Sequence, residues 1–175
     1  MKQSEFIFKR LSKDDDVSPF DCGDEAWQKE ISDFLKENAY KEQELGLNVT
    51  TLIYLESKLV AYFSLLSSQI LLTDAAWREK CGLDTVIYRN IPCVLIGRFG
   101  VDKSFQRQGK GRQLISWIRG SVLDLDIGVK FLTLHVDMNN VTGRTFWESE
   151  GFVVYDGIRP KERYYMIYDL YAKSV

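Results

Sequence analysis

Two closely spaced glycines, Gly109 and Gly111, lie in a polar loop between an apolar segment and a helical pattern. Glycine has no side chain, so phosphate oxygens can approach its backbone amide closely. The first amides of a helix have no partner within the helix, and the helix dipole attracts anions to that end. This combination indicates a diphosphate-binding site. Nearby basic residues add positive charge: Lys103, Arg107, Lys110 and Arg112.

The spacing excludes two common phosphate-binding loops. A P-loop requires lysine and then serine or threonine after its second glycine, whereas Arg112 follows Gly111. A dinucleotide-binding fingerprint requires a third glycine and a downstream acidic residue that closes a βαβ unit, and the loop does not meet these conditions. A glycine-containing turn with solvated basic side chains stays open as an alternative.

Hydrophobic periodicity predicts the elements that position this loop. Helices are expected after Asp24, which can cap the first of them, over 74–80, after the loop, and over 141–150, where Gly151 ends the last. The helix after the loop has an apolar face that includes Leu114, Ile118 and Leu125. The expected elements combine hairpins with strand–helix–strand units, which predicts an α+β class with a mixed sheet. Strands are expected over 6–11, 50–55, 59–67, 93–101, 131–136, 152–155 and 164–170.

The motif Gln106-x-x-Gly109-x-Gly111 resembles the acyl-CoA pyrophosphate motif of the GNAT N-acetyltransferase superfamily. After one helix and one strand, the segment from Asn140 to Phe152 is similar to the family's second cofactor segment. The resemblance covers the chain from about residue 50 onward. It implies a single-domain fold whose central mixed sheet has splayed strands flanked by helices, with acetyl-CoA (coenzyme A) as the cofactor. Since no linker interrupts the chain, one domain is expected over residues 1–175.

The resemblance also implies which residues contact the cofactor. The backbone of Phe99 and Val101 would pair with the pantetheine amides, the turn from Gln106 to Arg112 would hold the pyrophosphate, and Asn140 would contact the pantetheine or the thiol end. The cofactor-binding residues expected in this way are Phe99, Gly100, Val101, Gln106, Arg107, Gln108, Gly109, Lys110, Gly111, Arg112, Asn140 and Trp147.

The general acid departs from the family's pattern. Many members carry a tyrosine at the position of Trp147, where it protonates the departing thiolate. An indole N–H is a donor but no usable acid near neutrality. Another tyrosine can serve, with Tyr164, Tyr165 and Tyr168 as candidates, or the thiolate leaves unaided. We expect Tyr164 and Asn140 to be the catalytic residues; a non-catalytic acyl-CoA-binding module stays open as an alternative.

The strand over residues 93–101 also contains no Asp or Glu that could act as a general base. A lysine amine with a pKa of about 10.4 must lose a proton before it attacks, whereas an α-amine near 7.7–8.0 is already partly neutral. We therefore expect an acceptor amine of low pKa. His135 alternates with apolar residues on a predicted strand, which favours a structural or surface role over catalysis.

A narrower resemblance concerns the acceptor. Residues 20–23, residues 96–102 and the pair Val136-Asp137 are similar to a subgroup that contains acetyltransferase toxins acting on aminoacyl-tRNA. This leaves two hypotheses: an enzyme acting on a small-molecule, peptide or protein amine, and a toxin-like enzyme that modifies the α-amine of aminoacyl-tRNA. An antitoxin and tRNA are partners only under the second hypothesis, and a homodimer stays open under both.

Composition limits the alternatives further. The 175 residues carry a net charge of −2, unlike proteins that grip nucleic acid through many phosphate contacts, but this global charge leaves open a local basic surface formed by the arginines and lysines between residues 98 and 112. Three cysteines without metal-ligand spacing and a single histidine predict no metal site, and Cys93 is expected in the core. No apolar run approaches the length of a membrane helix, and the N-terminus shows no signal sequence, so a cytoplasmic location is expected.

Overall fold

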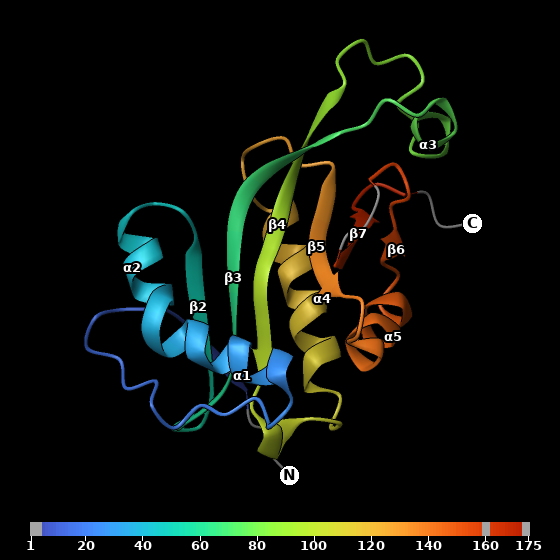
Figure 1. The fold of residues 1–175 in the computed structure, drawn as a ribbon. Helices are drawn as coiled ribbons and strands as arrows, with labels where there is room; N and C mark the ends of the chain where they lie inside the picture. The colour runs from blue at the N-terminus through green and yellow to red at the C-terminus, as the bar shows by residue number, and fades with distance from the viewer. Residues whose placement is uncertain (1–4, 159–161, 173–175) are drawn as a thin grey trace. The chain divides into compact units, whose positions relative to one another are not determined.

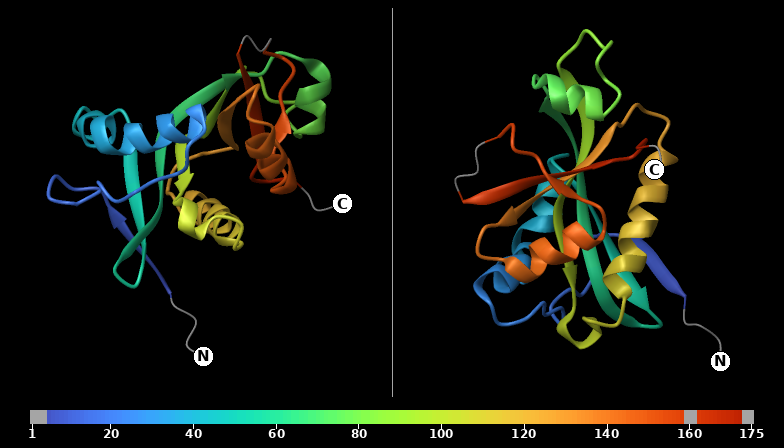
Figure 2. Two further views of the ribbon diagram at one scale, coloured as in Figure 1. Left: turned by 60° about the horizontal axis from the view of Figure 1, so that its bottom comes forward. Right: turned by 90° about the vertical axis from the view of Figure 1, so that its right-hand side faces the viewer.

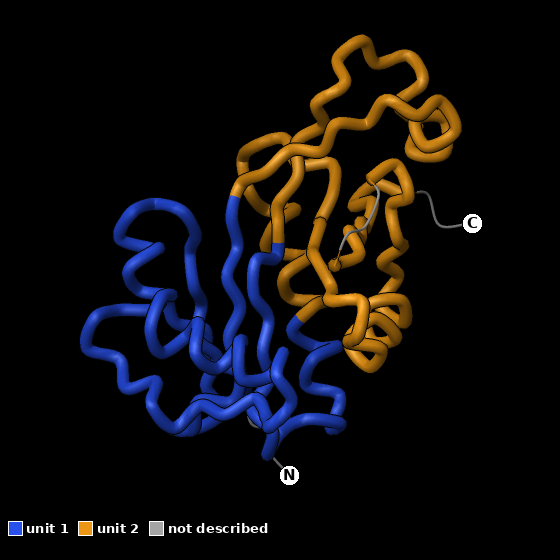
Figure 3. The backbone as a smooth tube through the Cα atoms, in the orientation of Figure 1, with its two compact units in different colours: residues 1–66, 96–114 blue, residues 67–95, 115–175 orange. Residues whose placement is uncertain are grey.

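The computed structural model describes residues 5–158 and 162–172. The first four residues, which belong to the N-terminus in which no signal sequence is expected, lie outside this part. The described residues form seven strands and five α-helices that mix hairpins with strand–helix–strand connections (Figure 1). The chain divides into two compact units by its internal contacts: residues 1–66 with 96–114, and residues 67–95 with 115–175 (Figure 3).

The strands form one sheet in the order β1-β2-β3-β4-β5-β7-β6. The pairs β1–β2, β2–β3, β5–β7 and β6–β7 are antiparallel. Strands β4 and β5 are neighbours joined through helix α4 (Lys110–Leu123), the kind of connection that parallel neighbours need. This confirms the predicted α+β class. The bounds are β1 Phe6–Arg10, β2 Val49–Leu55, β3 Lys58–Leu71, β4 Asn90–Val101, β5 Phe131–Asp137, β6 Val153–Val154 and β7 Arg163–Asp169.

In the first unit, a continuous helical segment lies along one face of β2 and β3 (Figure 2). It comprises α1 (Ala26–Asp33), the π-helix η1 (Phe34–Asn38) and α2 (Ala39–Glu44). Its apolar side chains bury against the strands, which stabilises both. The buried cluster consists of Leu11, Phe20, Cys22, Phe34, Leu35, Ala39, Leu52 and Tyr62.

The start of this helical segment differs from the prediction. Glu25, rather than Asp24, occupies the N-cap position of α1. The Glu25 N–H donates to Oε1 of Gln28 at 3.0 Å, so the side chain three residues later satisfies the amide that precedes the helix. The predicted hairpin is confirmed, because β2 and β3 pair antiparallel around a tight turn in which Glu56 adopts a φ of 57°.

In the second unit, β5, β6, β7 and parts of β3 and β4 are accompanied by α3 (Ala75–Lys80) and α5 (Val141–Ser149). Cys93 is buried, as predicted, and Gly151 ends α5 with a φ of 85°. The buried cluster of this unit consists of Ile70, Leu72, Cys81, Ile91, Cys93, Phe131, Tyr155, Tyr165 and Ile167.

Several predicted boundaries shift. Leu125 lies beyond the end of α4 and is exposed, so it does not belong to the apolar face of that helix. Strand β6 comprises two residues rather than four, as is common for a short edge strand, although its flanking residues Phe152 and Tyr155 are buried. The splaying of the central strands and the single domain over residues 1–175 stay predictions.

Candidate functional site

The predicted diphosphate turn lies wholly in the first unit. Strand β4 ends at Val101, a short 3₁₀ turn η2 (Lys103–Phe105) follows, and α4 begins at Lys110. Asp102 is buried at this junction. Its carboxylate accepts from the Ser104 N–H at 2.9 Å and from the Asp21 N–H at 3.0 Å, so one side chain fastens the turn to the loop before α1.

Gln106 fastens the turn from the other side. Its Nε2 donates to the carbonyl of Val101 at 2.8 Å and to the carbonyl of Cys22 at 2.7 Å. Both protons of the amide are therefore used within the protein. Burial raises the pKa of the neighbouring Cys22 thiol to about 11, so this cysteine is a neutral packing residue at physiological pH. Gln106 supports the turn instead of presenting its amide protons to a ligand.

The backbone of the turn adopts the left-handed region twice, at Arg107 with a φ of 58° and at Gly109 with a φ of 74°. A Cβ atom at Gly109 would meet nothing within 4 Å, so the positive φ, rather than close packing, favours glycine there. Helical hydrogen bonding begins with the Gln113 N–H, which donates to the Gly109 carbonyl at 3.3 Å. The amides of residues 110–112 thus form the N-terminal turn of a 14-residue helix, where an anion is favoured.

The basic side chains of this region are not equivalent. Lys103 forms an ion pair with Asp21 at 2.6 Å, and this hydrogen bond lowers the pKa of Asp21 and raises that of Lys103. Its charge is therefore locally balanced, contrary to the expected contribution to the cradle. Arg107 and Arg112 are exposed, and the Lys110 ammonium lies 5.4 Å from the centre of the Phe6 ring. Arg107 and Lys110 are better placed than Lys103 to provide positive charge.

The end of β4 has little room for side chains. A Cβ atom at Gly100 would approach Cγ2 of Ile31 to 2.7 Å and the Phe20 ring to 3.1 Å, so the glycine allows α1 to pack closely on the strand. Phe99 and Val101 flank it and are half-buried. Because strand residues alternate in direction, Phe99 and Val101 lie on the opposite face from Gly100.

The second group of predicted residues, Asn140, Trp147 and Tyr164, lies in the second unit. Asn140 is the N-cap of α5, where its Oδ1 accepts from the Gly143 N–H at 2.7 Å. Gly143 is suited to this cap, since a Cβ atom there would lie 2.5 Å from the Asn140 side-chain nitrogen. The side chain thus has a structural role, and its contact with the pantetheine stays a prediction.

Trp147 is buried between two aromatic neighbours. Its ring contacts those of Phe146 and Phe152 edge-on, each with ring centres 5.1 Å apart. Such packing fixes the end of α5 against Phe152, three residues beyond the helix. The indole is therefore a core component, and its predicted contact with the cofactor stays a prediction.

The three candidate tyrosines lie on β7. By strand alternation, Tyr164 and Tyr168 lie on one face and Tyr165 lies on the other. Tyr165 is buried, and burial raises its pKa to about 12, which makes it a weaker acid. The Arg119 guanidinium covers the ring of Tyr168 at 4.1 Å, and that of Arg144 lies 4.5 Å from the Tyr164 ring. Tyr164 is half-buried and lies one residue from the start of β7, and its role as the general acid stays a prediction.

His135 is exposed on β5, and its ring lies 4.9 Å from that of its cross-strand partner Tyr165. Partial desolvation, followed by the charge of Arg163, lowers the pKa of His135 below its ordinary value. The imidazole is consequently neutral at pH 7, and nothing in its contacts assigns it a catalytic part.

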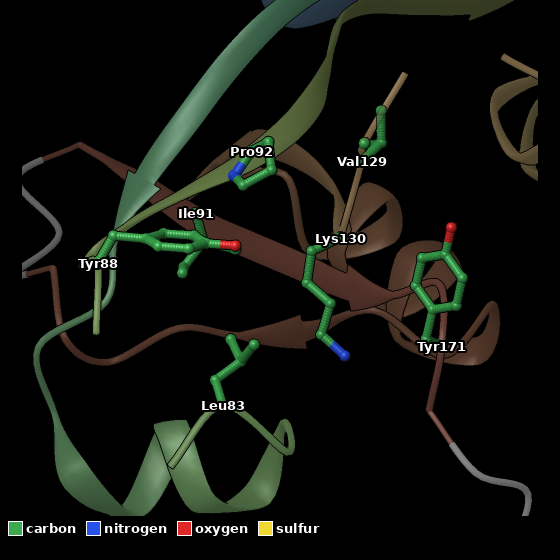
Figure 4. A pocket seen from close by; sticks show the side chains of 8 residues that line it. Leu83, Tyr88, Ile91, Pro92, Val129, Lys130 and Tyr171 are labelled. Carbon is green, nitrogen blue, oxygen red and sulfur yellow. The ribbon is translucent and has the colours of Figure 1, made fainter. Parts of the chain in front are cut away.

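A separate hollow of about 230 Å³ lies in the second unit (Figure 4). The Lys130 ammonium at its edge is paired with the Asp169 carboxylate at 2.8 Å, so its charge is balanced. The lining is otherwise mostly apolar and does not match a nucleotide. The lining residues are Leu83, Tyr88, Ile91, Pro92, Gly128, Val129, Lys130 and Tyr171.

Asp102 is a supporting residue to which the sequence analysis assigned no role. The signal that could have identified it is an aspartate two residues before a serine at the start of a turn, the pattern of a side chain that caps a backbone N–H.

In the described residues, no three His, Cys, Asp or Glu side chains gather as a metal site would require. No helix of this part combines the length and apolarity needed to cross a membrane.

Comparisons with known proteins agree with this geometry. The model of the acetyltransferase (GNAT) family matches residues 14–152. AtaT complexed with acetyl-methionyl-tRNAfMet is similar in structure, with a TM-score of 0.74 and 21% identity over 94% of this chain and 95% of that one. AtaTR bound with AcCoA gives a TM-score of 0.73 at 22% identity over 96% and 95%. A mutant of KacT gives 0.75 at 20% identity over 94% and 95%.

Proposed function

Because the chain belongs to the acetyltransferase (GNAT) family, we propose that it transfers an acetyl group to the α-amine of an aminoacyl-tRNA, as a toxin-like enzyme of the cytoplasm. Family membership makes the protein an N-acetyltransferase that uses acetyl-CoA. The acceptor, the location and the residue roles below are the proposed part.

The observation that carries the cofactor site is the turn at residues 106–112. It opens directly into α4, adopts the left-handed region at Arg107 and Gly109, and is fastened by the buried Asp102 and by Gln106. Backbone amides held in this way are already oriented before a diphosphate binds, so little ordering is required on binding. Arg107 and Lys110 add positive charge next to these amides, and the contact of Arg112 with the diphosphate stays a prediction.

Bound acetyl-CoA supplies an acetyl thioester as the donor. In the transfer, a bond forms between the acceptor nitrogen and the carbonyl carbon, the carbon–sulfur bond breaks, and one proton passes from the amine to the thiol. The backbone of Phe99 and Val101 would orient the pantetheine and place the thioester against the amine, a contribution that can supply much of the rate. Tyr164 is proposed to protonate the departing thiolate, with Asn140 placed at the pantetheine or thiol end.

The acceptor is inferred from what β4 lacks. From Asn90 to Val101 the strand carries no carboxylate that could deprotonate an incoming amine. An α-amine is already partly neutral near pH 7 and needs no such base, unlike a lysine side chain. The structural neighbours that are toxins, one of them solved with an acetylated aminoacyl-tRNA, support the same acceptor class and an antitoxin as a partner.

Thiol release from acetyl-CoA, measured against a panel of acceptors, tests the proposal. We expect release with aminoacyl-tRNA at a rate well above that with polyamines, peptides or lysine side chains. Expression of the chain alone should also arrest growth, and co-expression of an antitoxin should restore it. A strong preference for lysine side chains would contradict the proposed acceptor, and binding of acetyl-CoA without turnover by any amine would contradict catalysis.

A further inference from the structure

Arg98 occupies an unusual position in the first unit, one residue before Phe99 on β4. Its guanidinium lies 4.7 Å from the centre of the Phe34 ring. Phe34 in turn stacks on the ring of Tyr62, with ring centres 6.5 Å apart and planes 13° from parallel. Tyr62 is fully buried, so these three residues form a stack that runs from the core to the partly exposed guanidinium.

The helical segment is distorted at the base of this stack. Residues Phe34–Asn38 form the π-helix η1, in which the Ala39 N–H donates to the carbonyl of Phe34, five residues earlier. The Tyr62 hydroxyl donates to the Ile31 carbonyl at 2.6 Å and so supports the helix just before this distortion. π-Helical turns are rare and are frequently found at functional sites. Here the turn positions the Phe34 ring beneath Arg98.

The donors of Arg98 are only partly used by the protein. Nη1 donates to the Gly97 carbonyl at 2.8 Å, and Nη2 lies 3.5 Å from a carboxylate oxygen of Glu30. Nε is buried and has no hydrogen-bond partner among the described residues. The ion pair with Glu30 is long and partly exposed, with 31% of the Arg98 side chain and 51% of the Glu30 side chain accessible. A guanidinium held by stacking, with donor capacity remaining, is suited to an anionic ligand.

The place of Arg98 along β4 indicates which ligand this is. With the diphosphate at residues 106–112 and the pantetheine beside Val101 and Phe99, the thioester would lie near Arg98, at the far end of the pantetheine arm. Gly100, the next residue on the same face as Arg98, contacts Ile31 of α1, so Arg98 lies on the face that carries the helical segment.

We infer that Arg98, stacked on Phe34, binds an anionic group next to the acceptor amine: a phosphodiester of the terminal nucleotides of an aminoacyl-tRNA. This inference rests on the proposed function, because it takes the position of the thioester from it. A free carboxylate beside an α-amine offers the same chemistry, and the experiment separates the two sources.

Two matched pairs of acceptors provide the test. The first pair is an aminoacylated RNA minihelix and the same aminoacyl ester on adenosine, which lacks the phosphodiesters. The second pair is a dipeptide with a free carboxylate and its amide. For the wild-type protein, Arg98→Gln, Arg98→Lys and the control Lys36→Gln, kcat/KM is measured with every acceptor and Kd is measured for acetyl-CoA. Lys36 is an exposed cation of the same π-helix, so its replacement removes an equal charge from that segment.

Arg98→Gln should lower kcat/KM for the minihelix about 10- to 100-fold, the effect of losing hydrogen bonds to a charged group. It should change the adenosine ester and the affinity for acetyl-CoA less than about 3-fold, and Lys36→Gln should leave all values within about 2-fold. Arg98→Lys keeps the positive charge but lacks the planar guanidinium that can donate two parallel hydrogen bonds. Its kcat/KM for the minihelix should lie between the values for wild type and Arg98→Gln.

The outcomes distinguish the two proposals. Equal losses with both members of a pair, or no loss with either, would overturn the inference about Arg98. Selective loss with the dipeptide carboxylate, in a protein that does not acetylate the minihelix, would overturn the proposed aminoacyl-tRNA acceptor and the phosphodiester as the anion. It would still identify Arg98 as the residue that binds the anionic group. A thermal melt of each variant excludes loss of folding as the cause.

Discussion

The turn at residues 106–112 and the segment from Asn140 to Phe152 both match cofactor motifs, yet the two regions use their residues in different ways. In the turn, the groups that would hold the ligand are backbone amides, and the side chains of Asp102 and Gln106 hold that backbone in place. In the segment around α5, the side chains named by the motif are already used within the protein, Asn140 as a cap and Trp147 as a core residue.

This difference shows what each kind of motif encodes. A backbone site requires particular conformations, and glycine spacing reports these directly, as at Gly109. A side-chain site requires an uncommitted functional group, which spacing does not reveal. Variants that separate structural from chemical roles therefore test whether the two regions differ in this way.

The largest effect is expected at Tyr164. If this tyrosine is the general acid that Trp147 cannot be, Tyr164→Phe should lower kcat about 10²- to 10⁴-fold, because the thiolate would leave without a proton. The affinity for acetyl-CoA should change little. Single-turnover kinetics with Tyr168→Phe as the control measure this, because Tyr168 lies on the same strand and also against a guanidinium, so that variant removes an equivalent hydroxyl and should retain activity. Equal rates for wild type and Tyr164→Phe would remove Tyr164 from the mechanism.

A smaller effect is expected at Gln106. Gln106→Ala removes hydrogen bonds to the carbonyls of Val101 and Cys22, and the loosened turn should bind acetyl-CoA about 10-fold more weakly. The control is Gln108→Ala, which removes one bond to the Ser104 carbonyl from an exposed side chain. Calorimetric titration of both variants gives the comparison. If Gln108→Ala weakened binding more than Gln106→Ala, Gln106 would not be the residue that supports the turn.

Asn140 can be tested for its two roles separately. Asn140→Ala removes the cap of α5 and should lower the free energy of unfolding by about 1 kcal/mol, whereas Asn140→Asp retains an oxygen for the Gly143 amide and should restore stability. Thermal or urea unfolding measures this effect. If Asn140→Asp restored stability and yet weakened acetyl-CoA binding, Asn140 would have the cofactor role that its motif predicts in addition to the cap.

The smallest effect concerns His135. Its pKa is lowered in the folded protein, so protonation favours the unfolded state, where the imidazole has its ordinary pKa near 6.5. The His135 contribution to stability is therefore present above about pH 6.5 and is lost as the pH falls toward the folded pKa. His135→Gln should lose less stability than wild type between pH 7.5 and pH 5. Parallel slopes of unfolding free energy against pH would show that this residue contributes nothing.

Much of the fold could be predicted because periodicity and turn residues act locally. The β2–β3 hairpin, α3 and the end of α5 at Gly151 follow from such signals. The π-helix at Phe34–Asn38 could not be predicted, because the contacts beside it come from a distant strand, as in the hydrogen bond from the Tyr62 hydroxyl to the Ile31 carbonyl. For the same reason, the sequence did not reveal that Asp21 balances the charge of Lys103.

The central claim, that the turn at residues 106–112 binds the diphosphate of coenzyme A, is tested most directly at Gly109. Gly109→Glu places a carboxylate in the open space of the turn, and Gly109→Asn is the control because asparagine tolerates the left-handed conformation. Competition binding with acetyl-CoA and with S-acetyl-pantetheine, which lacks the diphosphate, measures both variants against wild type. We expect about 100-fold weaker binding of acetyl-CoA to Gly109→Glu and less than about 3-fold change for S-acetyl-pantetheine. Equal losses for the two compounds, or undiminished affinity for acetyl-CoA, would contradict diphosphate binding by this turn.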